Sequence, residues 1–167
     1  LEDLGVPSQR IAVVPNRPSF ELVEAQPEKT DSVLHICYIG TLTRWQGMYD
    51  AVRALEALVD VPFHLHILAP STGRADFQRW LSKRSIVSNV TFGDPLPKDE
   101  LRTFLASQDL GLAPLAPCRR NLLQGCMPIK VLDYMAAGLP VVASDIPVSR
   151  HLLGDSEYLY QPYSLDS

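Results

Sequence analysis

This 167-residue sequence has no long hydrophobic run, few cysteines and no excess of positive charge. Its apolar stretches are far shorter than the roughly 20 residues that cross a membrane as a helix. Three cysteines are an odd number without metal-type spacing, which indicates reduced thiols in a cytoplasmic protein rather than a disulfide framework. The net charge of −4 gives no electrostatic support for binding nucleic acid or acidic lipid.

What the sequence does contain is the mixture of an ordinary globular domain, with 46% hydrophobic and 20% charged residues. The chain starts at Leu1 without a methionine and stops soon after an expected strand, so we expect a fragment of a larger protein. Residues 1–31 are expected to form a leading strand and an interdomain linker segment, because residues 16–31 are rich in proline and lack periodicity. Residues 32–167 are expected to form the domain itself.

Strand-type and helix-type patterns alternate along the chain. Apolar strands between amphipathic helices predict an α/β fold with a doubly wound, mainly parallel, Rossmann-like sheet. Ligands bind such sheets at the carboxyl ends of the strands, where the strand order reverses. The expected strands are 11–15, 34–39, 63–69, 90–92, 109–114, 140–143 and 158–160, and the expected helices are 47–58, 74–85, 98–107, 129–137 and 147–153.

The segment 124–145 carries the strongest local signal. Pro128 suits the first position of a helix, because its missing N–H costs nothing there. The N–H groups of Ile129 and Lys130 then have no partner inside the helix and can hold an anion such as phosphate. Lys130 is a cation in the first turn, where the helix dipole disfavours it unless an anion is near. A weak surface pair between Lys130 and Asp133, one turn later, is the alternative.

A glycine loop at 40–47 follows the expected strand 34–39. Gly40 permits a sharp turn, and Gly47 permits a close approach at the start of the next helix. Arg44 carries a planar, charged fork that matches phosphate oxygens. Taken alone, this loop is typical of a surface turn. A second phosphate-type loop beside it, at Pro128, would favour a phosphate site.

Three stretches resemble one enzyme family. They read GVPSQRIAVVPN, YIGTLTRWQG and PIKVLDYMAAGLPVVASDIP, in the family's order. All three are similar to the C-terminal, nucleotide-sugar-binding domain of the retaining GT-B glycosyltransferases of family 4, also called group 1. With a weaker match at 90–115, the resemblance covers nearly the whole chain.

The resemblance implies a role for each matched residue. Gly40 and Thr41 would approach the donor's diphosphate beside the helix start. Asp133 would bond the ribose hydroxyls, and residues 93–96 would lie against the base. The donor-binding set implied in this way is Gly40, Thr41, Arg44, Gln46, Gly47, Gly93, Leu96, Gln124, Gly125, Met127, Pro128, Ile129, Lys130 and Asp133.

The same resemblance implies how the reaction is helped. Arg44 and Lys130 would stabilise the negative charge on the leaving group, which is electrostatic catalysis, and no other catalytic residue is indicated. No metal and no cofactor are implied, and the substrate would be a nucleoside diphosphate sugar.

The sequence also departs from the family pattern. The first acid of the E-x7-E motif is absent, because Gly125 stands at that position with Gln124 beside it. In the glycine loop, Thr41 and Gln46 replace the usual arginine and lysine. Either another cation neutralises the diphosphate, or the donor binds weakly. The candidate cations are Arg44, Lys130, Arg119 and Arg120.

As a whole, the resemblance implies the donor-binding half of a retaining glycosyltransferase that moves a hexosyl group. A missing N-terminal domain would hold most of the acceptor, so this half alone would bind nucleotide without transferring sugar. A cytoplasmic location is expected, with peripheral membrane association through the missing half as an option and no nucleic-acid partner. A degenerate, non-catalytic GT-B-like domain is one alternative. Another nucleotide-binding, Rossmann-like domain is disfavoured because GxGxxG is missing after every expected strand.

Other polar side chains fit structural roles better. His64 and His66 fall on one side of an expected strand, which predicts hydrogen-bonded residues on a sheet face, with His35 as a neighbour, rather than metal ligands. Trp45 is expected either to cover the nucleotide or to plug its loop. Cys126 is expected to pack under the loop as a small residue.

Overall fold

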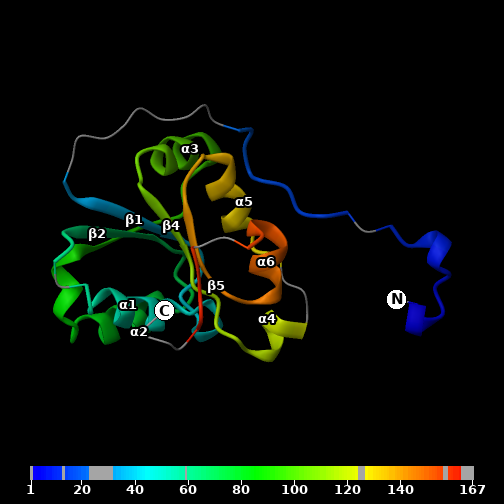
Figure 1. Cartoon of the computed structure of the whole chain (residues 1–167), viewed down its shortest axis with the longest axis horizontal. Helices are drawn as coiled ribbons and strands as arrows, with labels where there is room; N and C mark the ends of the chain where they lie inside the picture. Colours follow the sequence, from blue (N-terminus) through cyan, green and yellow to red (C-terminus); the bar gives the residue numbers. More distant parts are fainter. Residues whose placement is uncertain are drawn as a thin grey trace.

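The computed structural model describes residues 2–12, 14–22, 32–58, 60–123, 127–155 and 158–162. Six parallel strands form one sheet in the order β3-β2-β1-β4-β5-β6 (Figure 1). The order reverses between β1 and β4, and the carboxyl ends of these two strands therefore flank the switch point. The strands are β1 Leu34–Ile39, β2 Phe63–Leu68, β3 Val90–Gly93, β4 Leu110–Ala113, β5 Val141–Ser144 and β6 Leu159–Tyr160.

Helices cover both faces of the sheet, but on each face they cover mainly one half of it. Helices α1 and α2 lie on one side, whereas α3, α5 and α6 lie on the other (Figure 1). The α-helices are α1 Met48–Leu55, α2 Arg74–Leu81, α3 Lys98–Ala106, α4 Arg119–Leu123, α5 Ile129–Ala136 and α6 Pro147–Leu153. Short 3-10 turns are η1 Glu2–Leu4, η2 Ser8–Arg10, η3 Arg44–Gln46 and η4 Ser85–Asn89. None of the helices in the described ranges is long and apolar enough to cross a membrane.

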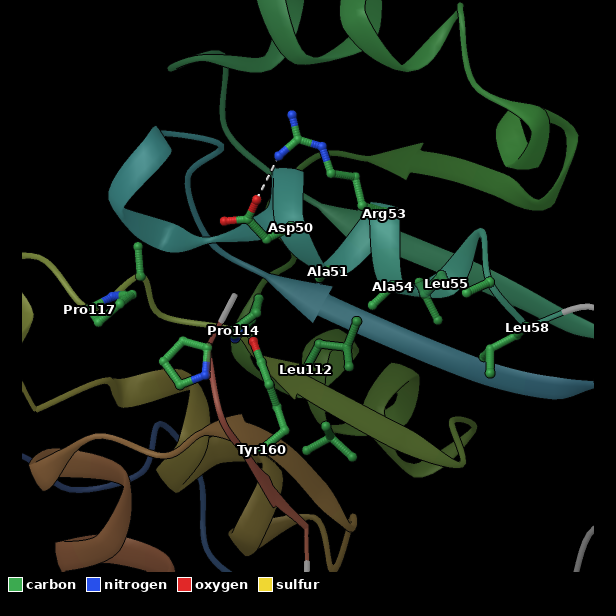
Figure 2. A pocket seen from close by; sticks show the side chains of 14 residues that line it. Asp50, Ala51, Arg53, Ala54, Leu55, Leu58, Leu112, Pro114, Pro117 and Tyr160 are labelled. Atoms are coloured by element: carbon green, nitrogen blue, oxygen red, sulfur yellow. Dashed lines mark hydrogen bonds and ion pairs between the residues drawn. The ribbon is translucent and has the colours of Figure 1, made fainter. Parts of the chain in front are cut away.

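An apolar groove of about 610 Å³ lies beside α1, on the face that α1 and α2 leave open over the second half of the sheet. Figure 2 shows Leu112 and Tyr160 on the sheet side of this groove, opposite α1. Its charged rim is a pair between Arg53 and Asp50, whose side chains meet at 2.8 Å. The groove therefore offers apolar surface rather than an unopposed charge.

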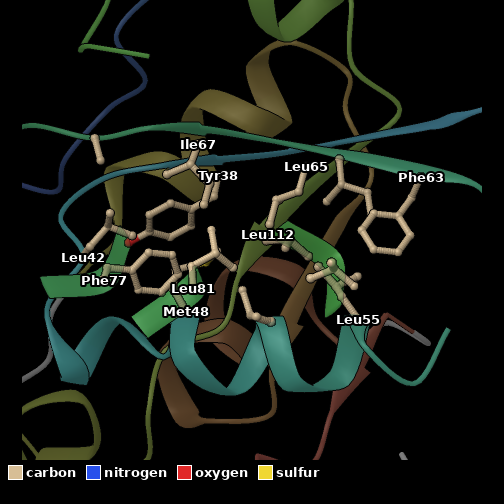
Figure 3. Close-up of a cluster of buried hydrophobic side chains, with 14 residues drawn as sticks. Tyr38, Leu42, Met48, Leu55, Phe63, Leu65, Ile67, Phe77, Leu81 and Leu112 are labelled. Carbon is tan, nitrogen blue, oxygen red and sulfur yellow. The ribbon is translucent and has the colours of Figure 1, made fainter. Parts of the chain in front are cut away.

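The main apolar core fills the space between the sheet and helices α1 and α2 (Figure 3). The alternation of side chains along β2 explains why the core lies on this face. Phe63, Leu65 and Ile67 point into the core. His64 and His66 point to the opposite face. Period-two alternation is the pattern of a strand with one buried and one more polar face.

A second core lies under α3, α5 and α6. Tyr134 of α5 is fully buried there and lies flat against β4. A Cβ placed on Gly111 would be 2.6 Å from the ring of Tyr134, so only glycine permits this contact between helix and strand. This packing fixes the height of α5 above the sheet and the position of its first turn.

The fold class expected from the sequence is confirmed, and most elements agree to within a few residues. The strand expected at 11–15 is wrong: the described residues there form no strand, and the segment ends in Pro15, with Pro7 and Pro18 on either side of it. The helix expected at 74–85 ends at Leu81, because Ser85 turns away and donates both its N–H and its hydroxyl to Glu56, at 3.0 and 3.1 Å. Helix α4 and the 3-10 turns were not expected.

Candidate functional site

The loop after β1 and the first turn of α5 meet beside the switch point of the sheet. Gly40 has a φ of 137°, which favours glycine, and its N–H extends the ladder to the carbonyl of Leu68. A Cβ on Gly40 would lie 2.9 Å from Lys130 Nζ. The structure therefore brings together the two segments that the sequence analysis paired, and we call this place the Lys130 corner.

Lys130 points inward and is only 8% exposed. Its Nζ donates a 2.7 Å hydrogen bond to Gln46 Oε1 and lies 4.0 Å from the centre of the Tyr38 ring. Such a position over an aromatic face is attractive for a cation. The alternative of a plain surface pair with Asp133 is wrong, because both side chains are buried and each bonds elsewhere.

Asp133 fastens the N-terminal segment to α5. Its carboxylate accepts hydrogen bonds from the N–H of Ser19 at 2.6 Å and from the Ser19 hydroxyl at 3.1 Å. Asn16 donates to the carbonyl of Met127 at 3.3 Å, and Phe20 is buried in the second core. The contact between Asp133 and a ribose stays a prediction, and a ribose would have to approach beside Ser19.

Two buried tyrosines shape the turn that ends β1. The hydroxyl of Tyr38 donates to the carbonyl of Thr41 at 2.6 Å, and burial raises the pKa of Tyr38 well above its usual range, which keeps it a donor. The hydroxyl of Tyr134 accepts from the N–H of Ile39 at 3.0 Å and donates to Leu112. These bonds hold the backbone around Gly40 from both faces of the sheet.

Two hydroxyls in this turn are buried without a partner. The Oγ1 atoms of Thr41 and Thr43 make no hydrogen bond within the described part of the chain. Buried polar atoms are nearly always satisfied by protein or by ordered water, so each unpaired one calls for an explanation. For Thr41, which follows Gly40 directly, a bound group that forms a hydrogen bond with Oγ1 at the corner would be such an explanation.

The far end of the glycine loop is locked to the loop after β4. Gly47 has a φ of 75°, and a Cβ there would lie 1.5 Å from the carbonyl oxygen of Pro114. Asn121 of α4 donates to the carbonyls of Trp45 and Ala116, at 2.9 and 2.7 Å. The conformation of the loop is therefore set by backbone contacts that no larger residue at position 47 would permit.

Further cations lie around this loop. The Arg120 guanidinium stacks over the Trp45 ring at 4.2 Å, so Trp45 has an arginine against its ring. Arg44 is exposed and lies 5.7 Å from the ring centre of Tyr49 on α1. Of the cations considered from the sequence, Lys130 is thus the one that the structure brings against Gly40.

The remaining expected residues fall into three groups. Gly93 ends β3, where a Cβ would lie 2.6 Å from Leu68, and Leu96 is half-buried in the loop that follows. Met127 is half-buried, Pro128 is buried, and Ile129 is 47% exposed at the start of α5. Gln124, Gly125 and Cys126 lie outside the described residues.

Sequence reasoning missed the supports of the corner. Ser19, Tyr38 and Tyr134 hold Asp133, the Gly40 turn and α5 in position. Tyr38 and Tyr134 carried a weak signal, since each is a hydroxyl-bearing residue at a position whose pattern is otherwise apolar. Ser19 carried none, because its partner is 114 residues away.

The histidines have the structural role that was expected. His66 lies between the other two groups, with Nε2 3.3 Å from His35 Nδ1 and Nδ1 3.0 Å from the Thr91 hydroxyl. His64 bonds the same hydroxyl at 3.2 Å. Among the described residues, no group of three or more histidine, cysteine or acidic side chains is arranged to hold a metal ion.

Comparison with known proteins assigns the family. The family model described as glycosyl transferases group 1 matches residues 34–167, which include every strand and both segments of the Lys130 corner. The chain belongs to the group 1 glycosyl transferases. The resemblance to the group 1 glycosyl transferases noted in the sequence is therefore confirmed.

Individual relatives of this group 1 domain are distant. TuaC of Bacillus subtilis (strain 168), described as a teichuronic acid biosynthesis glycosyltransferase, is 25% identical over 122 residues, or 73% of this chain and 27% of TuaC. The apo form of the lipopolysaccharide outer core galactosyltransferase WaaB superposes with a TM-score of 0.72 at 21% identity, over 99% of this chain and 46% of WaaB. Anabaena Alr3699/HepE in complex with UDP-glucose gives a TM-score of 0.64 at 15% identity, over 81% of this chain and 36% of HepE. The chain thus spans less than half the length of each.

Proposed function

We propose that this chain is the donor-binding half of a retaining glycosyltransferase that moves a hexosyl group from a nucleoside diphosphate sugar to an acceptor. The observation that carries the proposal is the Lys130 ammonium against the bare backbone of Gly40. A cation at a glycine turn suits a diphosphate, because hydrogen bonds between ammonium and phosphate are charge-assisted. Family membership supports the same class of substrate, as does the UDP-glucose bound to HepE.

The diphosphate would lie in the Lys130 corner. Lys130 would donate to its oxygens, and the first N–H groups of α5 at Ile129 would face it at the positive end of the helix dipole. The unpaired hydroxyl of Thr41 would gain a partner there. The base would lie against Gly93 to Leu96, and the ribose beside Asp133.

The chemistry needs charge stabilisation more than an acid or a base on this half. The bond between the anomeric carbon and the diphosphate oxygen breaks, the sugar joins an acceptor oxygen, and negative charge grows on the departing diphosphate. A cation already in position lowers the energy of that state more than it lowers the energy of the bound donor. Lys130 would supply this charge, with Arg44 and Arg120 as further cations near the loop, and no cofactor takes part.

The rest of the enzyme would lie outside this chain. An N-terminal domain would hold most of the acceptor, and the cleft between the two halves would be the active site. The full protein would work in the cytoplasm, with peripheral membrane contact through that other half. This half alone would bind nucleotide but would not transfer sugar.

Titration of the purified protein with UDP, GDP and ADP, followed by amide shifts, tests donor binding. We expect one of the three to bind, with shifts concentrated at residues 40–47 and at the start of α5. No binding by any of the three would refute the proposal. The uncharged nucleosides uridine, guanosine and adenosine serve as ligand controls.

The variant Lys130→Gln tests the phosphate role. We expect about a tenfold or greater loss of diphosphate affinity, with a smaller loss for the nucleoside, since the removed bond is charge-assisted. Lys83→Gln is the matched control, because Lys83 is exposed beyond the end of α2 and far from the corner in sequence. Equal losses for diphosphate and nucleoside would mean that the phosphate has been assigned to the wrong residue.

A degenerate, non-catalytic domain is the second candidate. The bonds between Asp133 and Ser19 favour it, because they occupy the carboxylate that would otherwise meet the ribose. An assay of the full polypeptide with a mixed panel of sugar nucleotides separates the two candidates. Sugar transfer or donor hydrolysis supports the enzyme, and nucleotide binding without either supports the degenerate domain.

A further inference from the structure

We propose that the guanidinium of Arg120, held over the Trp45 ring, binds the distal phosphate of the donor, which is the phosphate that carries the sugar. This inference rests on the proposed function, because that function supplies the diphosphate. Trp45 is then neither a cover for the nucleotide nor a plug of its loop, but a platform for the cation that meets one particular phosphate.

The stack of Arg120 on Trp45 joins two segments that are bonded to each other. The guanidinium lies 4.2 Å from the centre of the Trp45 ring. Asn121, the next residue of α4, is 2% exposed and donates to the carbonyl of Trp45 at 2.9 Å. The N–H of Ala116 donates to the same carbonyl at 3.1 Å. The backbone that carries the ring is therefore fixed against the segment that carries Arg120, which reduces the rotamer freedom that Arg120 loses when it binds a ligand.

A second tryptophan shows what is particular to Arg120. Trp80 has the Arg84 guanidinium 4.4 Å from its ring centre, and Arg84 also lies 3.8 Å from a carboxylate oxygen of Glu56. Arg120 is exposed and has no acidic partner within the described residues. The stack on Trp80 is thus completed by an anion of the protein itself, whereas the stack on Trp45 can accept an anion from outside.

The contact with the ring leaves the edge of the Arg120 guanidinium accessible. The N–H donors of a guanidinium lie in its plane, whereas its attraction to an aromatic ring acts through the face of that ring. No acceptor for these donors is present in the described part of the chain. Two phosphate oxygens match the guanidinium fork, so a charge-assisted, bidentate pair can form while Arg120 stays over Trp45.

The strand order puts the stack at the sugar end of the donor. Gly93 ends β3, the Gly40 turn follows β1, and Arg120 lies in α4, which follows β4. In the order β3-β2-β1-β4, the loop after β4 is the farthest of these three places from β3 along the carboxyl edge of the sheet. A nucleotide with its base against residues 93–96 and its phosphates at the Gly40 turn therefore extends toward Arg120 with its distal phosphate.

The distal phosphate contains the oxygen that leaves the sugar. When the bond between this oxygen and the anomeric carbon breaks, the electron pair stays on the oxygen, and negative charge grows on the phosphate beside Arg120. A guanidinium that a ring already holds there needs little reorganisation, so it stabilises the departing diphosphate more than the bound donor.

The first test compares a nucleoside diphosphate with its monophosphate. The probes are whichever of UDP, GDP and ADP binds the unaltered protein, and the matching UMP, GMP or AMP. For Arg120→Gln we expect about a tenfold or greater loss of affinity for the diphosphate but less than about a twofold loss for the monophosphate, since only the diphosphate reaches the stack. Equal losses for the two ligands would overturn the inference.

Arg84→Gln is the matched control. It removes the same side chain from the other tryptophan stack, between the end of α2 and the start of β3, at the amino edge of the sheet. Its affinities for the diphosphate and the monophosphate should equal those of the unaltered protein. Thermal unfolding of each variant shows that it is folded.

The second test measures whether Trp45 acts through Arg120. Trp45→Leu removes the aromatic face and should weaken diphosphate binding about threefold to fivefold, whereas Trp45→Phe keeps a ring and should weaken it less than about twofold. In the Arg120→Gln background, Trp45→Leu should cause no further loss, because the ring has no cation left to hold. The same loss in both backgrounds would mean that Trp45 contacts the nucleotide or supports the loop directly, and that result would overturn its role as a platform.

Binding of inorganic pyrophosphate separates this inference from the proposed function. If a nucleoside diphosphate binds and Arg120→Gln behaves like Arg84→Gln, the inference fails and the proposed function stands. If pyrophosphate binds and Arg120→Gln loses it, while UDP, GDP and ADP do not bind, the stack is a phosphate site and only the proposed function fails. If neither pyrophosphate nor any of the nucleotides binds, both are overturned.

Discussion

The Lys130 corner and the groove beside α1 differ in what they offer a ligand. The corner brings the buried cation of α5 against the Gly40 turn, with the Tyr38 ring beside it and the unpaired hydroxyl of Thr41 in the turn. The groove has about 610 Å³ of space, but its walls are mainly apolar and its Arg53 is already paired with Asp50. The two regions thus differ in the chemistry that they present to a ligand.

The difference shows why the groove is not the better candidate for a nucleotide site. A diphosphate gains most from fixed cations and N–H donors, which lower its free energy only where they converge. Apolar walls recover little of the cost of removing two phosphates from water. Four predictions follow the contrast between the two regions.

The largest effect is expected for Gly47→Ala at the far end of the glycine loop that begins in the corner. The new Cβ would collide with the carbonyl of Pro114 in a left-handed backbone, and we expect a loss of about 3 kcal/mol or more in the free energy of unfolding. Gly138→Ala is the control, because Gly138 has a similar φ of 68° but open space around it. That variant should lose only about 1 kcal/mol in denaturant unfolding. Equal losses would mean that backbone conformation, not the close approach, limits position 47.

Removal of a tyrosine hydroxyl should cost more in the second core behind the corner than in the groove. Tyr134→Phe leaves the N–H of Ile39 without its partner and should lower the free energy of unfolding by about 1–3 kcal/mol. Tyr160→Phe in the groove should lower it by less than about 1 kcal/mol, since the Tyr160 hydroxyl makes no hydrogen bond within the described residues whose loss would leave a buried partner unpaired. Urea unfolding of the two variants measures the difference, and a larger loss for Tyr160→Phe would reverse the comparison.

Alkaline pH should affect both regions in the same direction. Burial raises the pKa of Tyr38 and Tyr134 near the corner, and burial followed by the charge of Asp50 raises the pKa of Tyr160 in the groove. The stability these groups contribute is therefore complete below the unfolded pKa near 10 and is lost as pH rises above it, by about 1 kcal/mol per tyrosine and pH unit. Unfolding followed between pH 9 and 11 should show a shallower fall for each tyrosine-to-phenylalanine variant. An unchanged dependence of the free energy of unfolding on pH would mean that folding does not raise the pKa of the replaced tyrosine.

The smallest effect is expected for Ala54→Ser in the wall of the groove. Ala54 is exposed on α1, so its substitution should change the free energy of unfolding by less than about 0.5 kcal/mol. The affinity of the Ala54→Ser variant for UDP should equal that of the unaltered protein. A clear loss of UDP affinity would indicate that the nucleotide binds in the groove and would contradict the contrast between the two regions.

Much of the corner could be anticipated from local patterns. The glycines at 40 and 47 and the proline before Ile129 each impose a backbone geometry that depends on the residue type alone. The two segments could also be paired in advance, because loops at the carboxyl ends of neighbouring parallel strands meet at one edge of the sheet.

The partners within the corner could not be anticipated in the same way. Whether Lys130 turns toward Asp133 or toward Gln46 depends on which side of α5 is buried, and the bulk of Tyr134 against Gly111 sets that. The bond between Ser19 and Asp133 joins segments far apart in sequence, and no local pattern encodes such a pair.

By itself, the amino-acid sequence determined the alternation of strands and helices, the parallel sheet and the family, because these depend on periodicity and on short backbone motifs. Only the tertiary structure decided that the Lys130 ammonium donates to the amide of Gln46 and lies over the Tyr38 ring, and that mainly apolar side chains line the groove beside α1. The physical reason is that periodicity is a property of neighbouring residues, whereas the orientation of a buried charge depends on every side chain packed around it.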